Sequence, residues 1–139
     1  MAQSARPEPA TVLVVENEAI VRIELADWLA ERGLIVLQAD GADEAIALLD
    51  AHPEVKLLLT DITMPGSMDG ARLAHHVRGR WPPVKIIVMS GLIDAHLPEL
   101  PADSVVVAKP FRHEELWPSI AYLANDNSLT PGSRAASFR

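Results

Sequence analysis

The stretch VLVVENEAIV, residues 12–21, begins as an apolar run and then becomes abruptly acidic. Its first four residues are leucine and valines, without the polar alternation of a strand that faces solvent on one side. Such a run is typical of a strand covered on both faces, as in a parallel sheet. Directly after it, Glu16 and Glu18 bracket an amide residue, Asn17. This polar turn is therefore the first candidate for a functional site at a strand end.

Four further apolar runs of the same kind follow along the chain. They are LIVLQ (34–38), KLLLT (56–60), VKIIVM (84–89) and SVVVA (104–108). The segments between and after these runs repeat apolar residues at helical spacing, at 21–29, 42–49, 70–77 and 116–123. Between the fourth and fifth runs, Pro98 and Pro101 leave room for only about two helical turns. This alternation predicts an α/β protein with a doubly wound parallel sheet and right-handed crossovers.

The first helical segment makes a specific prediction. Val21, Leu25, Trp28 and Leu29 fall at i, i+4, i+7 and i+8, so all four should face the core. The helix should end near Gly33, because glycine readily adopts the left-handed conformation that follows many helices.

Length and composition limit the class of protein. The 139 residues suit one domain, which we place at residues 11–124, between mobile tails at 1–10 and 125–139. A net charge of −7 argues against a nucleic-acid surface, which needs a basic patch. There is no secretory signal and no apolar run of ~20 residues, so we expect a cytoplasmic protein without membrane contact. The absence of cysteine excludes disulfides and thiolate chemistry.

Polar residues of distinct types follow four of the five predicted strands. Glu16 and Asn17 follow the first, Asp61 the third, Ser90 the fourth and Lys109 the fifth. The carboxyl ends of parallel strands share one edge of a sheet, so these groups should meet in one cleft. Oxygen ligands without sulfur suit a hard divalent ion such as Mg²⁺. An aspartate beside a metal and a lysine can act as a nucleophile toward a phosphoryl group, whose charge the two cations neutralise.

Four motifs stand in the order and spacing of a known family. They are VLVVENE (12–18), LLLTDITMPGSMDG (57–70), VMSG (88–91) and AKPF (108–111). On these motifs the chain resembles a CheY-like response-regulator receiver domain over residues 11–124. The resemblance implies a flavodoxin-like fold, with a five-stranded parallel sheet in the order 2-1-3-4-5 and helices on both faces. It also implies a cis peptide bond between Lys109 and Pro110, where proline lowers the cost of the cis form.

The resemblance further implies a role for each polar residue of this edge. Asp61 would accept a phosphoryl group, Lys109 would contact that group, and the Ser90 hydroxyl would turn toward it as a switch. The ligands of Mg²⁺ would be Glu16, Asn17, Asp61 and the backbone carbonyl of Thr63.

Several features depart from the family's pattern. Asn17 replaces the usual aspartate of the acidic pair, so Mg²⁺ binding should be weakened, unless Asn17 caps the first helix instead. Val106 stands where the family often has an aromatic switch residue, and the loop MPGSMDG (64–70) is one residue longer than the common form. Pro118 cannot donate to the carbonyl four residues back, so the last helix should kink or restart near Trp117. Trp117 itself belongs either to the core or to a partner surface, and we expect the partner surface.

The predicted function is that of a single-domain response regulator. It would receive a phosphoryl group from a histidine kinase or phosphotransfer protein and act by contact with a downstream protein. Too few residues follow Tyr122 for an output domain. The protein would not be an enzyme, beyond self-catalysed phosphoryl transfer and dephosphorylation. The alternative is a pseudo-receiver, a docking module of the same fold that works without phosphorylation.

Two other classes of protein fit the sequence less well. A haloacid-dehalogenase-like phosphatase needs a second acid two residues after its aspartate, and Thr63 stands there. A flavodoxin-like cofactor binder needs a Gly/Ser/Thr-rich phosphate loop after the first strand, whereas this chain has the acidic ENEA (16–19).

Overall fold

The computed structural model describes residues 9–64, 66, 68–91 and 99–124. Apart from residues 9 and 10, the predicted tails lie outside this range, as do residues 92–98 of the segment with the weakest helical pattern. The helices and strands of the described residues follow in chain order. They are β1 (Thr11–Val15), α1 (Ala19–Glu31), β2 (Ile35–Ala39), α2 (Ala42–Ala51), β3 (Val55–Asp61), α3 (Gly70–Arg80), β4 (Lys85–Ser90), β5 (Val105–Ala108) and α4 (His113–Ala124).

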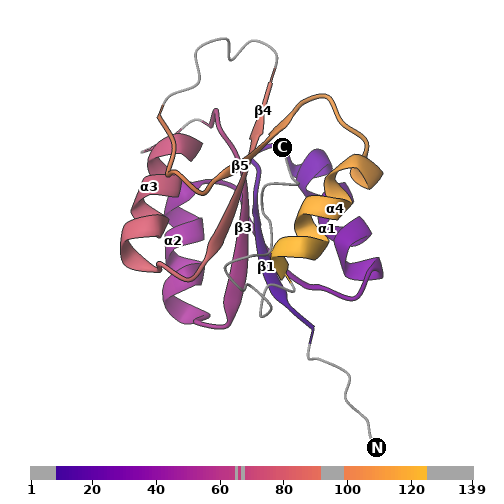
Figure 1. Ribbon diagram of the computed structural model, residues 1–139, viewed down its shortest axis with the longest axis horizontal. Coiled ribbons are helices and arrows are strands. Elements are labelled where there is room, and N and C mark those ends of the chain that lie inside the picture. The colour runs from indigo at the N-terminus through magenta and orange to yellow at the C-terminus, as the bar shows by residue number, and fades with distance from the viewer. Residues whose placement is uncertain (1–8, 65, 67, 92–98, 125–139) are drawn as a thin grey trace, which may run out of the picture.

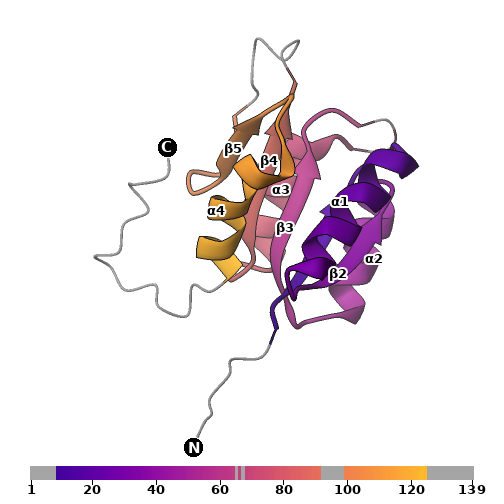
Figure 2. The same cartoon turned by 90° about the vertical axis from the view of Figure 1, so that its right-hand side faces the viewer.

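The strands form one parallel sheet in the order β2-β1-β3-β4-β5, which confirms the predicted topology. Figure 1 shows α2 and α3 on one side of this sheet and α1 and α4 on the other. Figure 2 looks onto the second side, where β3 is visible between α4 and α1. The fold is therefore a doubly wound sheet with all carboxyl strand ends at one edge.

Alternate residues of the central strands pack into two apolar cores, one on each face of the sheet. Val12 and Val14 of β1 pack with α1 and α4, whereas Leu13 and Val15 pack with α2 and α3. All four side chains are fully buried. Burial on both faces explains why the run in the sequence shows no alternation of polar and apolar residues.

The first helix follows the prediction at its end and departs from it at its start. The C-cap of α1 is Arg32, and Gly33 has the positive φ of 95° that was expected after the helix. Leu25 is buried and Trp28 packs half-buried against the same core, but Val21 is 41% exposed. The prediction for Val21 is wrong because this residue lies in the first turn of the helix, beside the polar turn that follows β1.

The last helix is a single element. Pro118 lies inside α4, which runs unbroken from His113 to Ala124, so the helix does not restart near Trp117. Leu116 and Ile120 are fully buried and anchor the helix on the sheet.

The peptide bond between Lys109 and Pro110 is cis, as predicted. It directly follows β5, whose last residue is Ala108.

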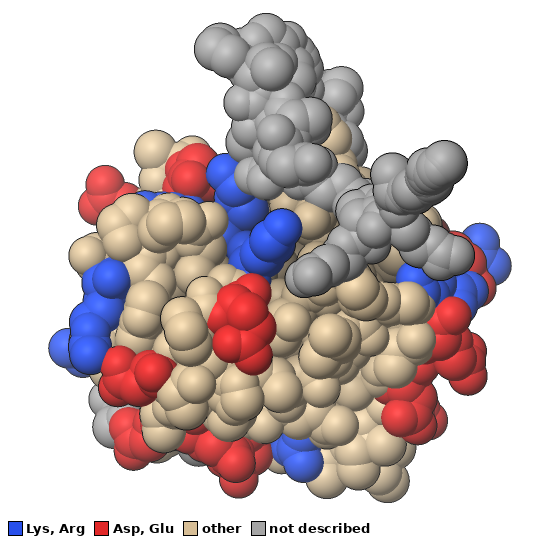
Figure 3. Space-filling view, turned by 90° about the horizontal axis from the view of Figure 1, so that it is seen from below, with Lys and Arg blue, Asp and Glu red and all other residues tan. Residues whose placement is uncertain are grey.

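The end of the molecule that carries the amino ends of the strands has a mixed surface. Figure 3 shows basic and acidic side chains interspersed there among other residues, without a large area of one sign. One ion pair, between Arg80 of α3 and Asp50 of α2, spans 2.7 Å and is half-exposed at both partners. The part of this face that the figure displays therefore lacks the basic patch that a nucleic-acid surface needs.

Candidate functional site

The carboxyl ends of β1, β3, β4 and β5 place most of the predicted site residues at one edge of the sheet. Asp61 and Ser90 are the last residues of β3 and β4. Glu16 directly follows β1, and Lys109 directly follows β5. Neighbouring strands are paired in register up to these ends, so residues distant in sequence arrive at the same level of the sheet.

Three of these side chains form a charged cluster, which consists of Glu16, Asp61 and Lys109. Lys109 Nζ makes an ion pair with Asp61 Oδ1 and lies 3.6 Å from Glu16 Oε1. Glu16 Oε2 accepts a hydrogen bond of 2.8 Å from the Glu18 N–H. The side chains of Glu16 and Asp61 are only 3% and 5% exposed, so water contributes little to stabilising their charges.

Burial and mutual contact shift the pKa values of this charged cluster. Burial raises the pKa of Asp61 from 3.8 to about 7; the neighbouring Glu16 adds to this rise, and the Lys109 ammonium opposes it. Burial also acts to raise the pKa of Glu16, but Asp61, the Glu18 N–H and Lys109 outweigh it and hold that pKa below its ordinary value. Burial acts to lower the pKa of Lys109, but the two carboxylates outweigh it and raise that pKa. Asp61 is therefore the group that exchanges a proton near neutral pH.

The backbone at Asp61 is held closely by the start of α3. The Gly70 N–H donates to the Ile62 carbonyl at 2.8 Å, and the Ile62 N–H donates to the Met89 carbonyl at 3.0 Å. A Cβ atom on Gly70 would lie 1.7 Å from the Asp61 carbonyl oxygen, so any side chain there would push α3 off the end of β3. In the sequence, Gly70 stands out only as a member of a helical stripe, and its role in this close approach depends on the packing of two distant elements.

Ser90 lies beside the charged cluster and is 6% exposed. Its carbonyl accepts a hydrogen bond of 2.7 Å from the Lys109 N–H, which ties the end of β4 to the residue after β5. Its hydroxyl donates to the carbonyl of Gly91 over 3.4 Å, near the upper limit for a hydrogen bond. A serine hydroxyl can rotate to another acceptor, so Ser90 can turn toward a new group in the cleft.

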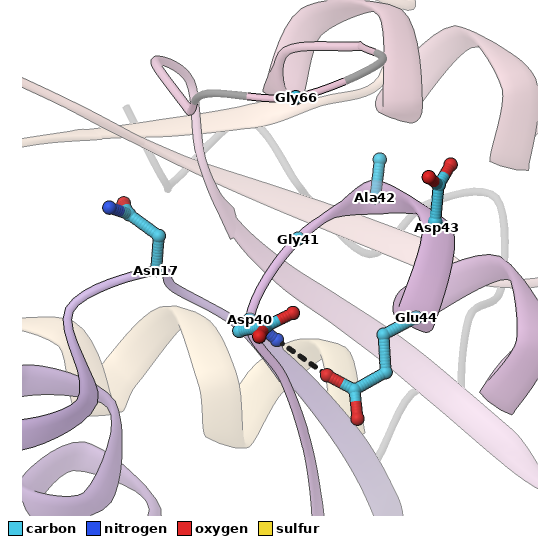
Figure 4. A pocket seen from close by; sticks show the side chains of 7 residues that line it. All are labelled: Asn17, Asp40, Gly41, Ala42, Asp43, Glu44 and Gly66. Carbon is cyan, nitrogen blue, oxygen red and sulfur yellow. Dashed lines mark hydrogen bonds between the residues drawn. The ribbon is translucent and has the colours of Figure 1, made fainter.

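Asn17 directly follows Glu16 in the chain. It is exposed and lines an open pocket, whose other wall is the turn after β2 and the start of α2. Figure 4 shows the Asn17 amide pointing away from the carboxylates of that wall. In that wall, Glu44 Oε1 accepts a hydrogen bond of 2.9 Å from the Asp40 N–H (Figure 4). Asn17 is therefore exposed toward this pocket, whereas Glu16 and Asp61 are buried.

The start of α1 is held by a residue that the sequence pattern does not single out. The N-cap of α1 is Glu18, whose side chain makes no capping hydrogen bond, so the alternative that Asn17 caps the helix is wrong. Instead, Arg22 Nη1 donates to the Glu16 carbonyl at 2.9 Å. The only signal in the sequence is a basic residue one turn into the helix that follows the acidic pair.

The remaining predicted residues lie further out. Thr63, two residues after Asp61, is exposed. Val106 is 42% exposed on the edge strand β5. Trp117 is half-buried, and its ring packs edge-to-face against that of Trp28 with 5.8 Å between centroids. Both Val106 and Trp117 thus keep surface that another molecule can contact.

The charged cluster has the chemistry of a cation site. Glu16 Oε1 is buried and accepts no hydrogen bond from any residue in the described ranges. When both carboxylates are ionised, one ammonium leaves one negative charge uncompensated, which attracts a divalent cation with oxygen ligands. Asn17, the residue after Glu16, carries an amide oxygen, which is also a ligand type that Mg²⁺ accepts. Within the described chain, no group of three or more His, Cys, Asp or Glu is placed to hold a metal. The residues fit Mg²⁺ that keeps several of its waters.

Comparison with known proteins assigns the chain to a family. The family model of the response regulator receiver domain matches residues 12–121. The chain belongs to this family, whose members are signalling domains of two-component systems. No helix among the described residues is both long enough and apolar enough to cross a membrane.

Individual relatives show the same similarity. Sensor kinase CckA from Brucella abortus is 37% identical over 111 residues, which cover 77% of this chain and 12% of CckA. Transcriptional regulatory protein PdtaR from Mycobacterium tuberculosis is 33% identical over 116 residues, or 81% of this chain and 55% of PdtaR. The chain thus spans about half the length of PdtaR and a small part of CckA. The structure of response regulator protein TrrA from Thermotoga maritima, in complex with Mg(2+)-BeF, matches with a TM-score of 0.73 and 28% identity. That match covers 82% of this chain and 98% of the TrrA chain.

Proposed function

We propose that this receiver domain accepts a phosphoryl group on Asp61 from a histidine kinase or phosphotransfer protein and passes the signal on by protein contact. The observation that carries the proposal is the buried carboxylate of Asp61, ion-paired with Lys109 at the edge where the strands end. A carboxylate with a fixed cation beside it can attack phosphorus, because the cation neutralises charge on the transferred group. The membership in the receiver-domain family supports the same assignment.

The proposed transfer forms one bond and breaks one bond. A carboxylate oxygen of Asp61 attacks the phosphorus of the donor's phosphohistidine, the P–N bond breaks, and its electron pair stays on the imidazole nitrogen. Lys109 contacts the phosphoryl oxygens, and the Ser90 hydroxyl rotates to donate to one of them. Mg²⁺ would add charge neutralisation when bound, with Glu16, Asn17, Asp61 and the Thr63 carbonyl as its ligands.

An exposed apolar surface beside the acceptor supports a protein as the donor. Ile20 and Ile23 of α1 are 74% and 45% exposed, and they lie one helical turn apart. The helix that carries them begins three residues after Glu16. Large apolar side chains that are exposed together on one helix are a feature of protein–protein contacts. A donor that docks on this surface would place its phosphohistidine near Asp61.

The surface for the downstream protein is proposed on β5 and α4. Val106 lies on the edge strand next to Lys109, and Trp117 lies on the helix that follows it. Val106 is not an aromatic switch residue. A change at Lys109 would therefore reach this surface through movement of the backbone that leads into α4. Trp117 would then change its contact with Trp28.

The proposal is tested by incubation with a small phosphodonor and Mg²⁺, followed by intact-mass measurement. The expected result is the gain of one phosphoryl group by the wild type and none by Asp61→Asn. Asp27→Asn, which alters an exposed carboxylate of α1, is the matched control and should behave as the wild type. Phosphorylation that persists in Asp61→Asn would overturn the assignment of the acceptor.

The second candidate is the pseudo-receiver, which docks without being phosphorylated. One observation favours it: the residue after Glu16 is the neutral and exposed Asn17, so the proposed metal ligands lack the charge of one carboxylate. The same experiment separates the two candidates. A wild type that gains no phosphoryl group even at saturating Mg²⁺, yet still binds a partner kinase, would establish the docking function.

A further inference from the structure

Arg22 joins the acidic turn after β1 to the edge strand β2. Its Nη1 donates to the carbonyl of Glu16 at 2.9 Å, and its Nε donates to the side-chain oxygen of Gln38 at 3.1 Å. The carboxylate of Glu16 is also held, since Oε2 accepts the Glu18 N–H at 2.8 Å. The turn formed by residues 16–18 is therefore fixed from the α1 side as well as by its own backbone.

The carbonyl that Arg22 holds belongs to the peptide group between Glu16 and Asn17. A peptide group is planar, so an oxygen fixed in space also fixes the directions in which the two flanking Cα atoms leave the plane. The side chains of Glu16 and Asn17 start from those two atoms. A single hydrogen bond from Arg22 thus orients both Glu16 and Asn17.

The geometry around Arg22 requires a guanidinium and not merely a positive charge. Gln38 pairs in register with Val14, which faces the α1 side of the sheet, so Gln38 presents its amide toward α1. The planar fork of arginine donates to Gln38 and to the Glu16 carbonyl at the same time, whereas a lysine offers one compact ammonium. The side chain of the N-cap residue, Glu18, makes no capping bond at this end of the helix.

We propose that Arg22 is a positioning residue, which sets the Glu16–Asn17 peptide plane and thereby the affinity of the acidic edge for Mg²⁺. The proposal rests on the proposed function at one point, that Mg²⁺ binds at this edge. Arg22→Lys keeps the positive charge and loses the planar guanidinium that donates to two acceptors at once. It should weaken Mg²⁺ binding about tenfold to a hundredfold, the range that loss of one charge-assisted hydrogen bond gives.

A purely electrostatic role for Arg22 predicts the opposite pattern. A cation near the metal repels it, so neutral Arg22→Gln would then bind Mg²⁺ more tightly than the wild type, and Arg22→Lys would be unchanged. Under the positioning role, both variants bind Mg²⁺ more weakly. Gln38→Ala should weaken binding less than Arg22→Lys, and it should add nothing in the Arg22→Lys background, because both changes remove the same fixed fork.

The experiment combines calorimetric Mg²⁺ titration with two measurements that need no metal. These are amide hydrogen exchange at Glu18 and the thermal unfolding midpoint, for the wild type and each variant. Arg80→Lys is the control, since Arg80 forms an exposed ion pair on α3. Weaker Mg²⁺ binding and faster exchange at Glu18 in Arg22→Lys, with an unfolding midpoint close to that of the wild type, support the positioning role.

Other outcomes overturn the proposal separately from the proposed function. Unchanged Mg²⁺ affinity and unchanged Glu18 exchange in Arg22→Lys would show that Arg22 does not position the turn. A lower unfolding midpoint with unchanged affinity would show that Arg22 has only a structural role. If the wild type binds no Mg²⁺, the metal site fails and with it the stated role of Arg22, whereas faster Glu18 exchange would then still report that Arg22 orders the turn.

Discussion

Replacement of Asp61 by asparagine should stabilise the protein at pH 8 and do so by clearly less at pH 5. The side chain of Asp61 is 5% exposed and shares the cleft with Glu16 and one ammonium, that of Lys109. Its pKa rises from 3.8 to about 7 on folding, chiefly because of burial. The ionised form is therefore disfavoured in the folded state, and an amide of the same shape removes that cost.

The magnitude and its pH window follow from this pKa. A folded-state pKa above the unfolded value means that the folded state binds more protons between about pH 4 and 7, so stability falls as pH rises through that window. A rise of about three pH units corresponds to about 4 kcal/mol gross at pH 8. The asparagine amide must itself be desolvated in the folded state, so about 2–4 kcal/mol should remain, or roughly 5–15 °C in the unfolding midpoint.

The assay is urea or thermal unfolding of wild type and Asp61→Asn at pH 8 and pH 5, without divalent cations. Asp50→Asn is the control, because Asp50 forms an exposed ion pair with Arg80 and should matter by less than about 1 kcal/mol at either pH. Mg²⁺ at a hundred times its dissociation constant should then stabilise the wild type by about 2.7 kcal/mol and Asp61→Asn much less. A loss of stability in Asp61→Asn at pH 8, or an equal effect at both pH values, would refute the reasoning.

Three further predictions concern neighbouring parts of the cleft. Gly70→Ala should destabilise by roughly 3 kcal/mol or more in urea unfolding, because its Cβ meets the Asp61 carbonyl, whereas Gly79→Ala, with open space around it, should not. Asn17→Asp should bind Mg²⁺ about tenfold to a hundredfold more tightly by calorimetry, and equal affinities would place Asn17 outside the metal site. At limiting Mg²⁺, the phosphorylation rate of Asp61 should rise with pH through about 7, as its carboxyl ionises; a flat profile would contradict the raised pKa.

The sequence predicts the strands and the polar edge well, because both depend on patterns that a single chain displays. Residues 12–15 lack polar alternation since α helices cover both faces of β1, and the structure buries all four. The meeting of Glu16, Asp61 and Lys109 follows from parallel topology alone, since parallel strands share one carboxyl edge. These predictions need no knowledge of individual side-chain contacts.

Other features depend on contacts between distant residues, which periodicity cannot reveal. Val21 has the correct helical spacing for the core but lies beyond the apolar part of the sheet, so 41% of its surface remains exposed. Arg22 donates both to the Glu16 carbonyl and to Gln38, which lies sixteen residues later on β2. Gly70 matters because α3 meets β3 at the Asp61 carbonyl. In each case, the role of the residue depends on its surroundings in the folded protein, which the spacing along its own helix does not show.

The amide at position 17 is best understood through the charge of the whole edge. With Asn17, two buried carboxylates face one ammonium, and the pKa of Asp61 already reaches about 7. An aspartate at this position would add a like charge near Asp61 and raise that pKa further in the absence of metal, since like charges disfavour ionisation. Mg²⁺ would then be needed to ionise the acceptor at neutral pH. Under the proposed function, Asn17 would therefore lower the affinity for Mg²⁺ and, for the same electrostatic reason, keep Asp61 closer to its ionised form when little Mg²⁺ is bound.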